Sequence, residues 1–457
     1  MLAKKAVDNG PSLFYSALSV MLNQKHPLFI LAHQINWSVF EEAFAPLYCL
    51  DNGRPAKPIR LMVGLLILKH LRNVSDESVV EQWAENNYYQ FFCGELNFMP
   101  RVPCEASELV HFRKRIGQAG IELIFKESIR INGKDAEEQH VSVDTTVQEK
   151  NITYPTDAKL HRKIIAKCQA ISNKNDLKQR QSYTFTLKKL GIAQRFRNHP
   201  KNKGKARKAD KKVKTIAGRL VRELERNLPP DAYAEEIDLF KRVLAQKRAD
   251  KSKVYSLHEP EVQCISKGKE HKKYEFGNKA SIIYTQNTGV IVGAMGFRNE
   301  YDGHTLEPAL KQHERLTGRQ AKSATVDRGY QGKSKIGETE IAIPKPFNSK
   351  KLSVHKQIKL RKRFKRRASI EPVIAHLKSD YRLGRNFYKG IFGDNINIML
   401  AAAAFNFKRM YNKYKIALLA LFFKWIKNLE LTPIKIIALM NHSKSTNNKI
   451  LKLKWAF

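Results

Sequence analysis

An acidic residue stands between cations in the segment 366–379, a pattern typical of the opening of a helix. Ser369 is the expected N-cap, and a proline falls in the first turn, where no intrahelical N–H partner is needed. At about 3.6 residues per turn, Arg367, Glu371 and Lys378 lie on one side of this helix. A carboxylate held there suits a hard cation, and the neighbouring cations suit phosphate. An ordinary salt-bridged surface helix has the same spacing, so this segment alone leaves both interpretations open.

Two aspartates accompany short apolar segments that have the pattern of strands. His140–Val147 alternates and is rich in β-branched residues, and it contains Asp144. Ser323–Val326 is a second short strand, and it ends at Asp327. An acid inside a β-branched strand is unfavourable unless it has a partner or a role, although aspartates at strand ends also form turns.

Together the three acids predict a metal site. Asp144, Asp327 and Glu371 would repel one another at close range unless cations neutralised them. Mg²⁺ or Mn²⁺ takes oxygen ligands and leaves positions for water and substrate phosphates. Two such ions can activate an attacking hydroxyl and stabilise the leaving oxygen of a phosphodiester.

The composition favours a nucleic-acid enzyme. The 457 residues include 83 Lys and Arg against 43 Asp and Glu, a net charge of +40, with an ordinary hydrophobic content of 42%. Five scattered cysteines without a Cys-x-x-Cys pair argue against a zinc module and for reduced cytosolic thiols. The most apolar run, Ile416–Phe423, is far shorter than the roughly 20 residues that span a membrane. We therefore expect no membrane partner and a cytoplasmic, nucleoid-associated protein.

Composition and periodicity divide the chain into three parts. Residues 1–130 form short helices with basic faces, which fit either a helix-turn-helix-like DNA-binding domain or a plain helical bundle. Arg113, on a helix expected over Ser107–Gly117, is a candidate DNA contact. Residues 135–410 combine strands and helices, and residues 411–457 form a lysine-rich helical tail without an assigned role.

A basic helical insert, residues 156–250, interrupts the middle part after the first strand. Between Lys159 and Arg219 it holds twenty Lys or Arg against two acids. Such a run is usually a solvated face, and here we expect that face to lie on phosphates. After the insert come a hairpin, a helix, two short strands and the Glu371 helix. This order predicts an α/β fold in which a mixed sheet is flanked by helices, with an all-α domain before it.

The acids lie within motifs that resemble a known family. Phe364, Arg367, Glu371 and Lys378 have the spacing of the Tyr-Arg-Glu-Lys signature of bacterial insertion-sequence transposases of the DDE type, with Phe in place of Tyr. Asp327-Arg328-Gly329-Tyr330 and Val143-Asp144-Thr145-Thr146 resemble the motifs of the two aspartates. The resemblance, which covers about residues 20–410, is to the group named after insertion sequence five.

This resemblance implies a ribonuclease H-like catalytic core. The activity would be cleavage at transposon ends followed by strand transfer into target DNA. Asp144 and Asp327 would be the main ligands of two metal ions, and Glu371 would complete the site. A homodimer is expected because two DNA ends must be brought together.

Several cations and histidines around these motifs receive roles by the same resemblance. The predicted DNA contacts are Arg328, Arg366, Arg367, Lys378 and the N-terminal Arg113. For His304 and His376 a packing or DNA-facing role is favoured over a ligand role, because imidazole is a poor partner for Mg²⁺.

Two other functions stay open at this point. The charge alone would suffice for a catalytically inactive nucleic-acid-binding relic, and the unmatched tail agrees with that hypothesis. A metal-dependent nuclease that cuts but never joins would use the same three acids.

Overall fold

The structure is a computed structural model. It describes residues 16–49, 51–229, 231–247, 249–266, 272–330, 334–344 and 353–428. The tail was predicted over residues 411–457, and its part from residue 429 onward lies outside these ranges. The helix that leads into it, and that includes Ile416–Phe423, continues to Asn428.

The N-terminal part is helical, as predicted. Its helices are α1 (Leu18–Met21), α2 (Pro27–Gln34), α3 (Ser38–Phe44), α4 (Ile59–Leu71), α5 (Asp76–Glu85), α6 (Asn87–Phe92) and α7 (Ala106–Arg130), with short 3₁₀ turns η1 (Ala45–Leu47) and η2 (Gly133–Glu137). The Ser75 hydroxyl caps α5, and the Asn86 side chain caps α6 by accepting from two backbone N–H groups. The nearly continuous apolar sequence of α4 is buried on all sides, which makes this helix the centre of the N-terminal core.

Helix α7 is longer than the sequence predicted. Gly117 has φ 64° and ψ −169°, outside helical geometry, and the helix resumes after it. The helix expected over Ser107–Gly117 therefore breaks at Gly117, as predicted, and a second helical segment follows it within α7. The glycine marks a kink, because a residue without a side chain adopts this left-handed backbone at low cost.

A mixed sheet forms the centre of the molecule. Its strands are β1 (His140–Lys150), β2 (Gln263–Ile265), β3 (Glu275–Thr285), β4 (Ile291–Phe297), β5 (Ser323–Thr325), β6 (Lys335–Ile336), β7 (Thr339–Ala342) and β8 (Arg385–Asn386). Strand β1 pairs with β3 in antiparallel fashion and with β5 in parallel fashion, and β7 lies parallel to β5 on the far side. The prediction of a mixed sheet with helices against it is confirmed.

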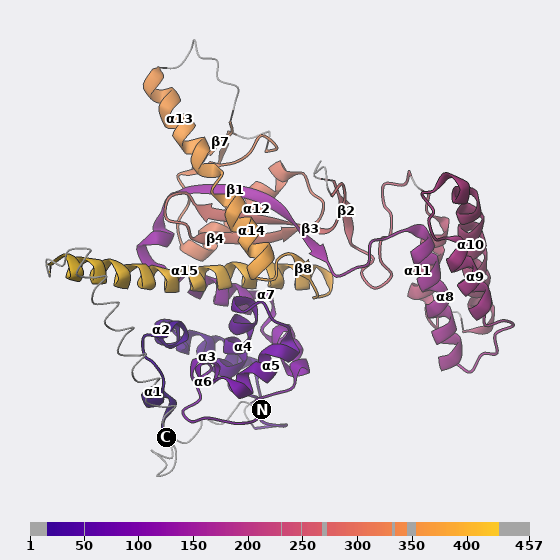
Figure 1. Ribbon diagram of the computed structural model, residues 1–457, viewed down its shortest axis with the longest axis horizontal. Helices are drawn as coiled ribbons and strands as arrows, with labels where there is room; N and C mark the ends of the chain where they lie inside the picture. The colour runs from indigo at the N-terminus through magenta and orange to yellow at the C-terminus, as the bar shows by residue number, and fades with distance from the viewer. Residues whose placement is uncertain are drawn as a thin grey trace, which may run out of the picture.

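Four later helices complete this part of the molecule: α12 (Asp302–Thr317), α13 (Val354–Arg367), α14 (Ile370–Asp380) and α15 (Gly390–Asn428). Helix α12 packs against β3 and β4, and α14 packs against β1. The long helix α15 contacts α4 and α7 as well as β4, so it joins the N-terminal helices to the sheet (Figure 1). The basic segment before Glu371 forms α13, which projects from the rest of the fold.

Amide side chains cover the outer edge of β4. Gln312 of α12 both donates to and accepts from the backbone of Ala294. Asn395 and Asn406 of α15 accept from the backbone N–H groups of Gly296 and Ile291. An edge strand with free backbone groups is prone to pair with other chains, and these side chains satisfy those groups.

The helical insert has a hydrophobic core of its own. Its helices are α8 (Asp157–Lys174), α9 (Thr184–Ala193), α10 (Pro200–Asn227) and α11 (Ala234–Ala245). Ile164, Val213, Leu220 and Phe240 are buried in a cluster separate from the main core. The insert lies to one side of the sheet in Figure 1 and is joined to it through the end of β1 and the segment before β2.

Arg113 is buried, contrary to the prediction that it contacts DNA. Only 4% of the residue is exposed, and its guanidinium donates to both oxygens of Asp76 at 2.8 Å. Lys69 lies 2.9 Å from the same carboxylate and donates to the Tyr388 hydroxyl at 2.8 Å. Although burial acts to raise it, Arg113 and Lys69 hold the pKa of Asp76 below its usual value. These charges join the N-terminal helices to the start of α15, so Arg113 has a structural role here.

Removing the Asp76 carboxylate should therefore be costly. We expect Asp76→Ala to lower the free energy of unfolding by about 3–5 kcal/mol, because it leaves two buried cations without their partner. The measurement is the midpoint of urea unfolding followed by circular dichroism. Glu137→Ala, which removes an exposed pair with Arg319, is the control and should cost at most about 1 kcal/mol. Equal losses in the two variants would contradict the structural role of the buried pair.

Candidate active site

Asp144 lies on β1, and Asp327 lies two residues after the end of the neighbouring parallel strand β5. In the β1–β5 ladder, His140 is opposite Ser323 and Ser142 is opposite Thr325. Asp144 and Asp327 each lie two residues beyond this last pair, so they take equivalent positions along the two chains. Neighbouring strands are about 4.8 Å apart, so this register, continued past the end of β5, would bring the two residues near each other.

Tyr330 is buried within electrostatic range of the two aspartates and of a third, Asp302. Its ring is buried, and the carboxylates of Asp144, Asp302 and Asp327 all act on its hydroxyl. Burial, followed by these negative charges, raises the pKa of Tyr330 well above its ordinary value. The phenol is therefore a neutral group that faces three carboxylates.

Asp302 is a member of this cluster that the sequence did not predict. It begins α12, and its carboxylate accepts from Lys279 of β3 at 2.9 Å. A Cβ placed on Gly329 would lie 3.0 Å from Asp327 Oδ1 and 3.7 Å from Asp302 Oδ2, so both carboxylates approach the same point. The only sequence signal was an acid at the start of a helix after the hairpin, which is too common to single out a site.

Glu371 lies on α14, the helix that packs against β1. Its side chain is 65% exposed and is 3.9 Å from the Arg367 guanidinium. The predicted N-cap was wrong: Ser369 has a helical backbone, and its side chain makes no cap hydrogen bond, because α13 ends only two residues earlier. The helix nevertheless begins at the predicted place, with Pro372 in its first turn.

Comparisons with known proteins identify the family. A family model described as a transposase domain (DUF772) matches residues 16–115, and one described as a transposase DDE domain matches residues 244–407. An uncharacterized protein of Rhizobium meliloti, ORF8 in the nfe locus, is 41% identical over 192 residues, which cover 41% of this chain and 92% of that protein. No solved structure matches the chain. The chain belongs to the insertion-sequence transposases of the DDE type.

The transposase domain matches include some of the site and leave out the rest. Asp302, Asp327 and Glu371 lie within the DDE match, whereas Asp144 and most of the insert lie between the two matches. No helix in the described part of the chain combines the length and hydrophobicity needed to cross a membrane.

The predicted site residues are of the chemical type that binds Mg²⁺. Carboxylate oxygens are the ligands that Mg²⁺ prefers, and the β1–β5 register would bring Asp144 and Asp327 near each other. Among the described residues, however, no group of three or more His, Cys, Asp or Glu side chains is close enough together to hold a metal ion. The three-acid ligand set of this transposase stays a prediction.

The cations and histidines near the motifs occupy different environments. Arg328 and Arg366 are exposed, while Lys378 and Arg367 are half-buried. His376 is bonded to Asp380 at 2.8 Å on the surface of α14. His304, which is also exposed, lies edge-on to Tyr301.

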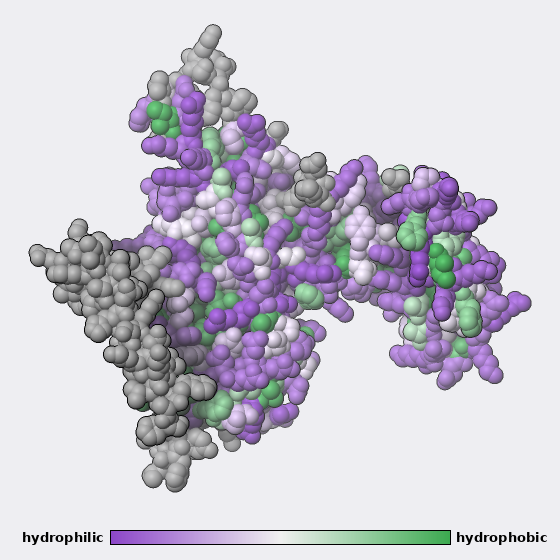
Figure 2. Space-filling model, in the orientation of Figure 1, coloured by the Kyte–Doolittle hydropathy of each residue, from purple (hydrophilic) through white to green (hydrophobic). Residues whose placement is uncertain are grey.

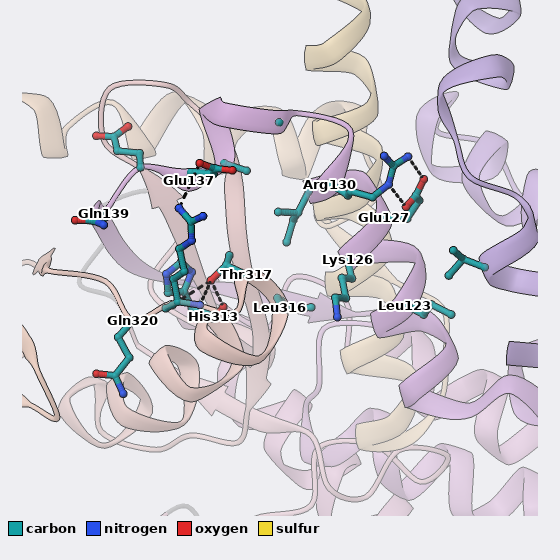
Figure 3. A pocket seen from close by; sticks show the side chains of 16 residues that line it. Leu123, Lys126, Glu127, Arg130, Glu137, Gln139, His313, Leu316, Thr317 and Gln320 are labelled. Carbon is teal, nitrogen blue, oxygen red and sulfur yellow. Dashed lines mark hydrogen bonds and ion pairs between the residues drawn. The ribbon is translucent and has the colours of Figure 1, made fainter.

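A pocket of about 400 Å³ lies elsewhere, between the C-terminal parts of α7 and α12 (Figure 3). Three cations line it: Arg130 is paired with Glu127 and Arg319 with Glu137, and the third is Lys126. None of the four acids discussed above lines it. This pocket is not part of the site that the aspartates form.

Crowding the aspartates should impair the transposase. We expect Gly329→Ala to lower the transposition frequency of a marked element by about ten- to a hundredfold, because the new methyl group displaces the Asp327 carboxylate. DNA binding, measured by gel mobility shift, should be unchanged. Gly218→Ala in α10 is the control, since its methyl group meets only the end of the Arg222 side chain, at 3.4 Å. A full transposition frequency in Gly329→Ala would show that the position of this carboxylate is unimportant.

Proposed function

We propose that this transposase cleaves DNA at the ends of its element and joins those ends to target DNA. The catalytic domain would be a ribonuclease H-like fold, and the reaction would use two Mg²⁺ or Mn²⁺ ions. The group named after insertion sequence five is the subgroup that its motifs favour. The membership of the chain in the DDE family supports transposition itself, while the chemistry is our proposal.

One observation supports this proposal: the parallel β1–β5 register, which would bring Asp144 beside Asp327 if it continued two residues beyond its last pair. Two carboxylates in such positions would provide closely spaced oxygen donors on a rigid support. The neutral phenol of Tyr330 next to them adds no further negative charge. Bound divalent ions would supply Lewis acidity and a water or hydroxyl nucleophile of lowered pKa.

Glu371 would be the third ligand. Its contact with Arg367 is 3.9 Å long and largely exposed, and an ion pair of this kind contributes little to stability. A DNA phosphate that binds Arg367 would therefore release the Glu371 carboxylate at little cost. In this proposal, DNA binding and completion of the metal site occur together.

Cations near the predicted metal site would bind the DNA, and a second copy of the chain would complete the complex. Arg328, Arg366 and Lys378 would bind phosphates close to the cleaved bond. Arg113 is left out, because it is buried and paired. Two copies of the chain would hold two DNA ends, and we expect the protein to act in the cytoplasm on the nucleoid.

The decisive experiment is a cleavage and joining assay with labelled duplexes from both edges of the element. We expect Mg²⁺-dependent cleavage by the wild type and none after EDTA. Glu371→Gln should reduce cleavage by about a thousandfold or more while leaving duplex binding intact, because a carboxylate ligand is lost. Asp380→Asn is the control, since it changes another exposed acid of the same helix.

The outcomes separate the alternatives. Cleavage without joining would identify a nuclease. Binding without cleavage by the wild type would identify an inactive relic. Retained Mg²⁺-dependent cleavage by Glu371→Gln, or by Asp144→Asn or Asp327→Asn, would remove the three-acid proposal.

Asp302 should behave differently from the three acids. Its charge is already compensated by Lys279, so it acts in this proposal as a positioning residue beside Asp327. We expect Asp302→Asn to retain measurable cleavage, reduced about tenfold, and to raise the Mg²⁺ concentration at half-maximal rate. A loss as complete as that of Asp327→Asn would instead make Asp302 a metal ligand.

A further inference from the structure

The insert has a basic surface that the carboxylate site does not use. Eight cations lie along the first half of α10: Lys201, Lys203, Lys205, Arg207, Lys208, Lys211, Lys212 and Lys214. All are exposed, and within the described part of the chain none of them forms an ion pair. The single acid of this half, Asp210, is paired with Arg197 at 2.8 Å.

Folding of the insert does not require this charge. The opposite side of α10 packs into the core of the insert through residues such as Ala206, Ala209 and Val213. Like charges one turn apart on a helix repel each other, so the exposed side lowers the stability of the helix. A bound polyanion would offset that repulsion.

An exposed aromatic side chain adjoins these cations. Phe196 is 83% exposed and lies in the turn between α9 and α10, with a left-handed φ of 50°. Gln194 donates to Asp210 at 2.6 Å and Asn202 donates to the Arg195 carbonyl, so the turn is fixed against α10. Apolar residues stand out among hydrophilic ones over the insert in Figure 2. Aromatic rings beside cations stack on, or insert between, nucleic-acid bases.

Positive charge continues from the insert toward the sheet. A hollow of about 590 Å³ lies where the segments after α11 meet the start of α15. Its lining includes Arg242, Lys251, Lys253, Arg298 and Lys389, with two glutamates. A DNA segment that follows the insert would thus meet further cations on its way to the sheet.

We propose that the first half of α10 and the turn at 194–199 form a second DNA-binding surface, outside the carboxylate site. The cations bind phosphates, and Phe196 contacts bases. This inference rests on the proposed function, because it assigns the surface to DNA that adjoins the cleaved end. A lipid surface is the other polyanion that such a patch fits, and the test includes it.

The first test removes charge from the full-length protein. Lys205→Gln, Lys208→Gln and Lys212→Gln are combined in one variant, and Arg219→Gln, Arg222→Gln and Arg226→Gln, with the same spacing on the same helix, form the control. Binding to an element-end duplex of about 30 base pairs is followed by fluorescence anisotropy over a salt series. The slope of log K against log salt should fall by about 2–3 in the first variant and by less than about 1 in the control.

The second test concerns the aromatic ring. Phe196→Ala should bind an element end with an unpaired flank about tenfold more weakly than the wild type, through loss of base stacking. Phe185→Ala is the control, since Phe185 is 87% exposed at the start of α9 and is not fixed beside Asp210. Circular dichroism establishes that every variant is folded.

The results distinguish this inference from the proposed function. If the wild type cleaves DNA but the first variant keeps the wild-type salt slope, the second surface is wrong and the catalytic proposal stands. If the wild type neither binds nor cleaves element ends, the proposed function fails. An unchanged slope together with binding to anionic phospholipid vesicles, lost in the same variant, would assign the patch to lipid. Equal effects of the two phenylalanine variants would contradict the role of Phe196.

Discussion

The site depends on the parallel pairing of β1 with β5. A shift of one residue would turn Asp144 to the opposite face of the sheet and away from Asp327. The first pair of the ladder is fixed by a hydrogen bond of 2.7 Å between the side chains of His140 and Ser323. Beyond the site, Lys150 at the other end of β1 bonds to Asp394 at 2.8 Å. The position of the two catalytic candidates is thus set by polar contacts at both ends of one strand.

The Lys150 end of β1 is a buried polar network. Asn386 and Asn278 both donate to Asp394, and Lys150 also donates to the Tyr388 carbonyl at 2.9 Å. Burial raises the pKa of Asp394 above its usual value even though Lys150 acts to lower it. Such a network adds little net stability compared with apolar packing, but its polar groups are hydrogen-bonded in only one arrangement of these residues. It therefore fixes where β1, β3, β8 and α15 meet, and where the chain leaves the sheet for the insert.

Local patterns predicted the elements well, and tertiary contacts account for the differences. The alternation in His140–Val147 predicted a strand because successive side chains of a strand point to opposite faces of the sheet. The hairpin after the insert was predicted as well. Gly117 was read as a helix end, and the backbone leaves helical geometry there; the second helical segment of α7, which the sequence did not predict, follows it. Arg113 was read as a DNA contact because its partner Asp76 lies 37 residues away in sequence. Asp302 was missed for the same reason: its approach to Asp327 depends on how α12 crosses from β4 to β5.

The same strand that holds Asp144 also carries the insert. Strand β1 runs six residues from Asp144 to Lys150, and at about 3.3 Å per residue this is roughly 20 Å of rigid chain. B-DNA rises about 3.4 Å per base pair along its axis, so this distance corresponds to about six base pairs. DNA bound on the insert and at the carboxylates must therefore extend well beyond the cleaved bond. A duplex shorter than this would reach only one of the two surfaces, because the sheet does not bend to shorten the path between them.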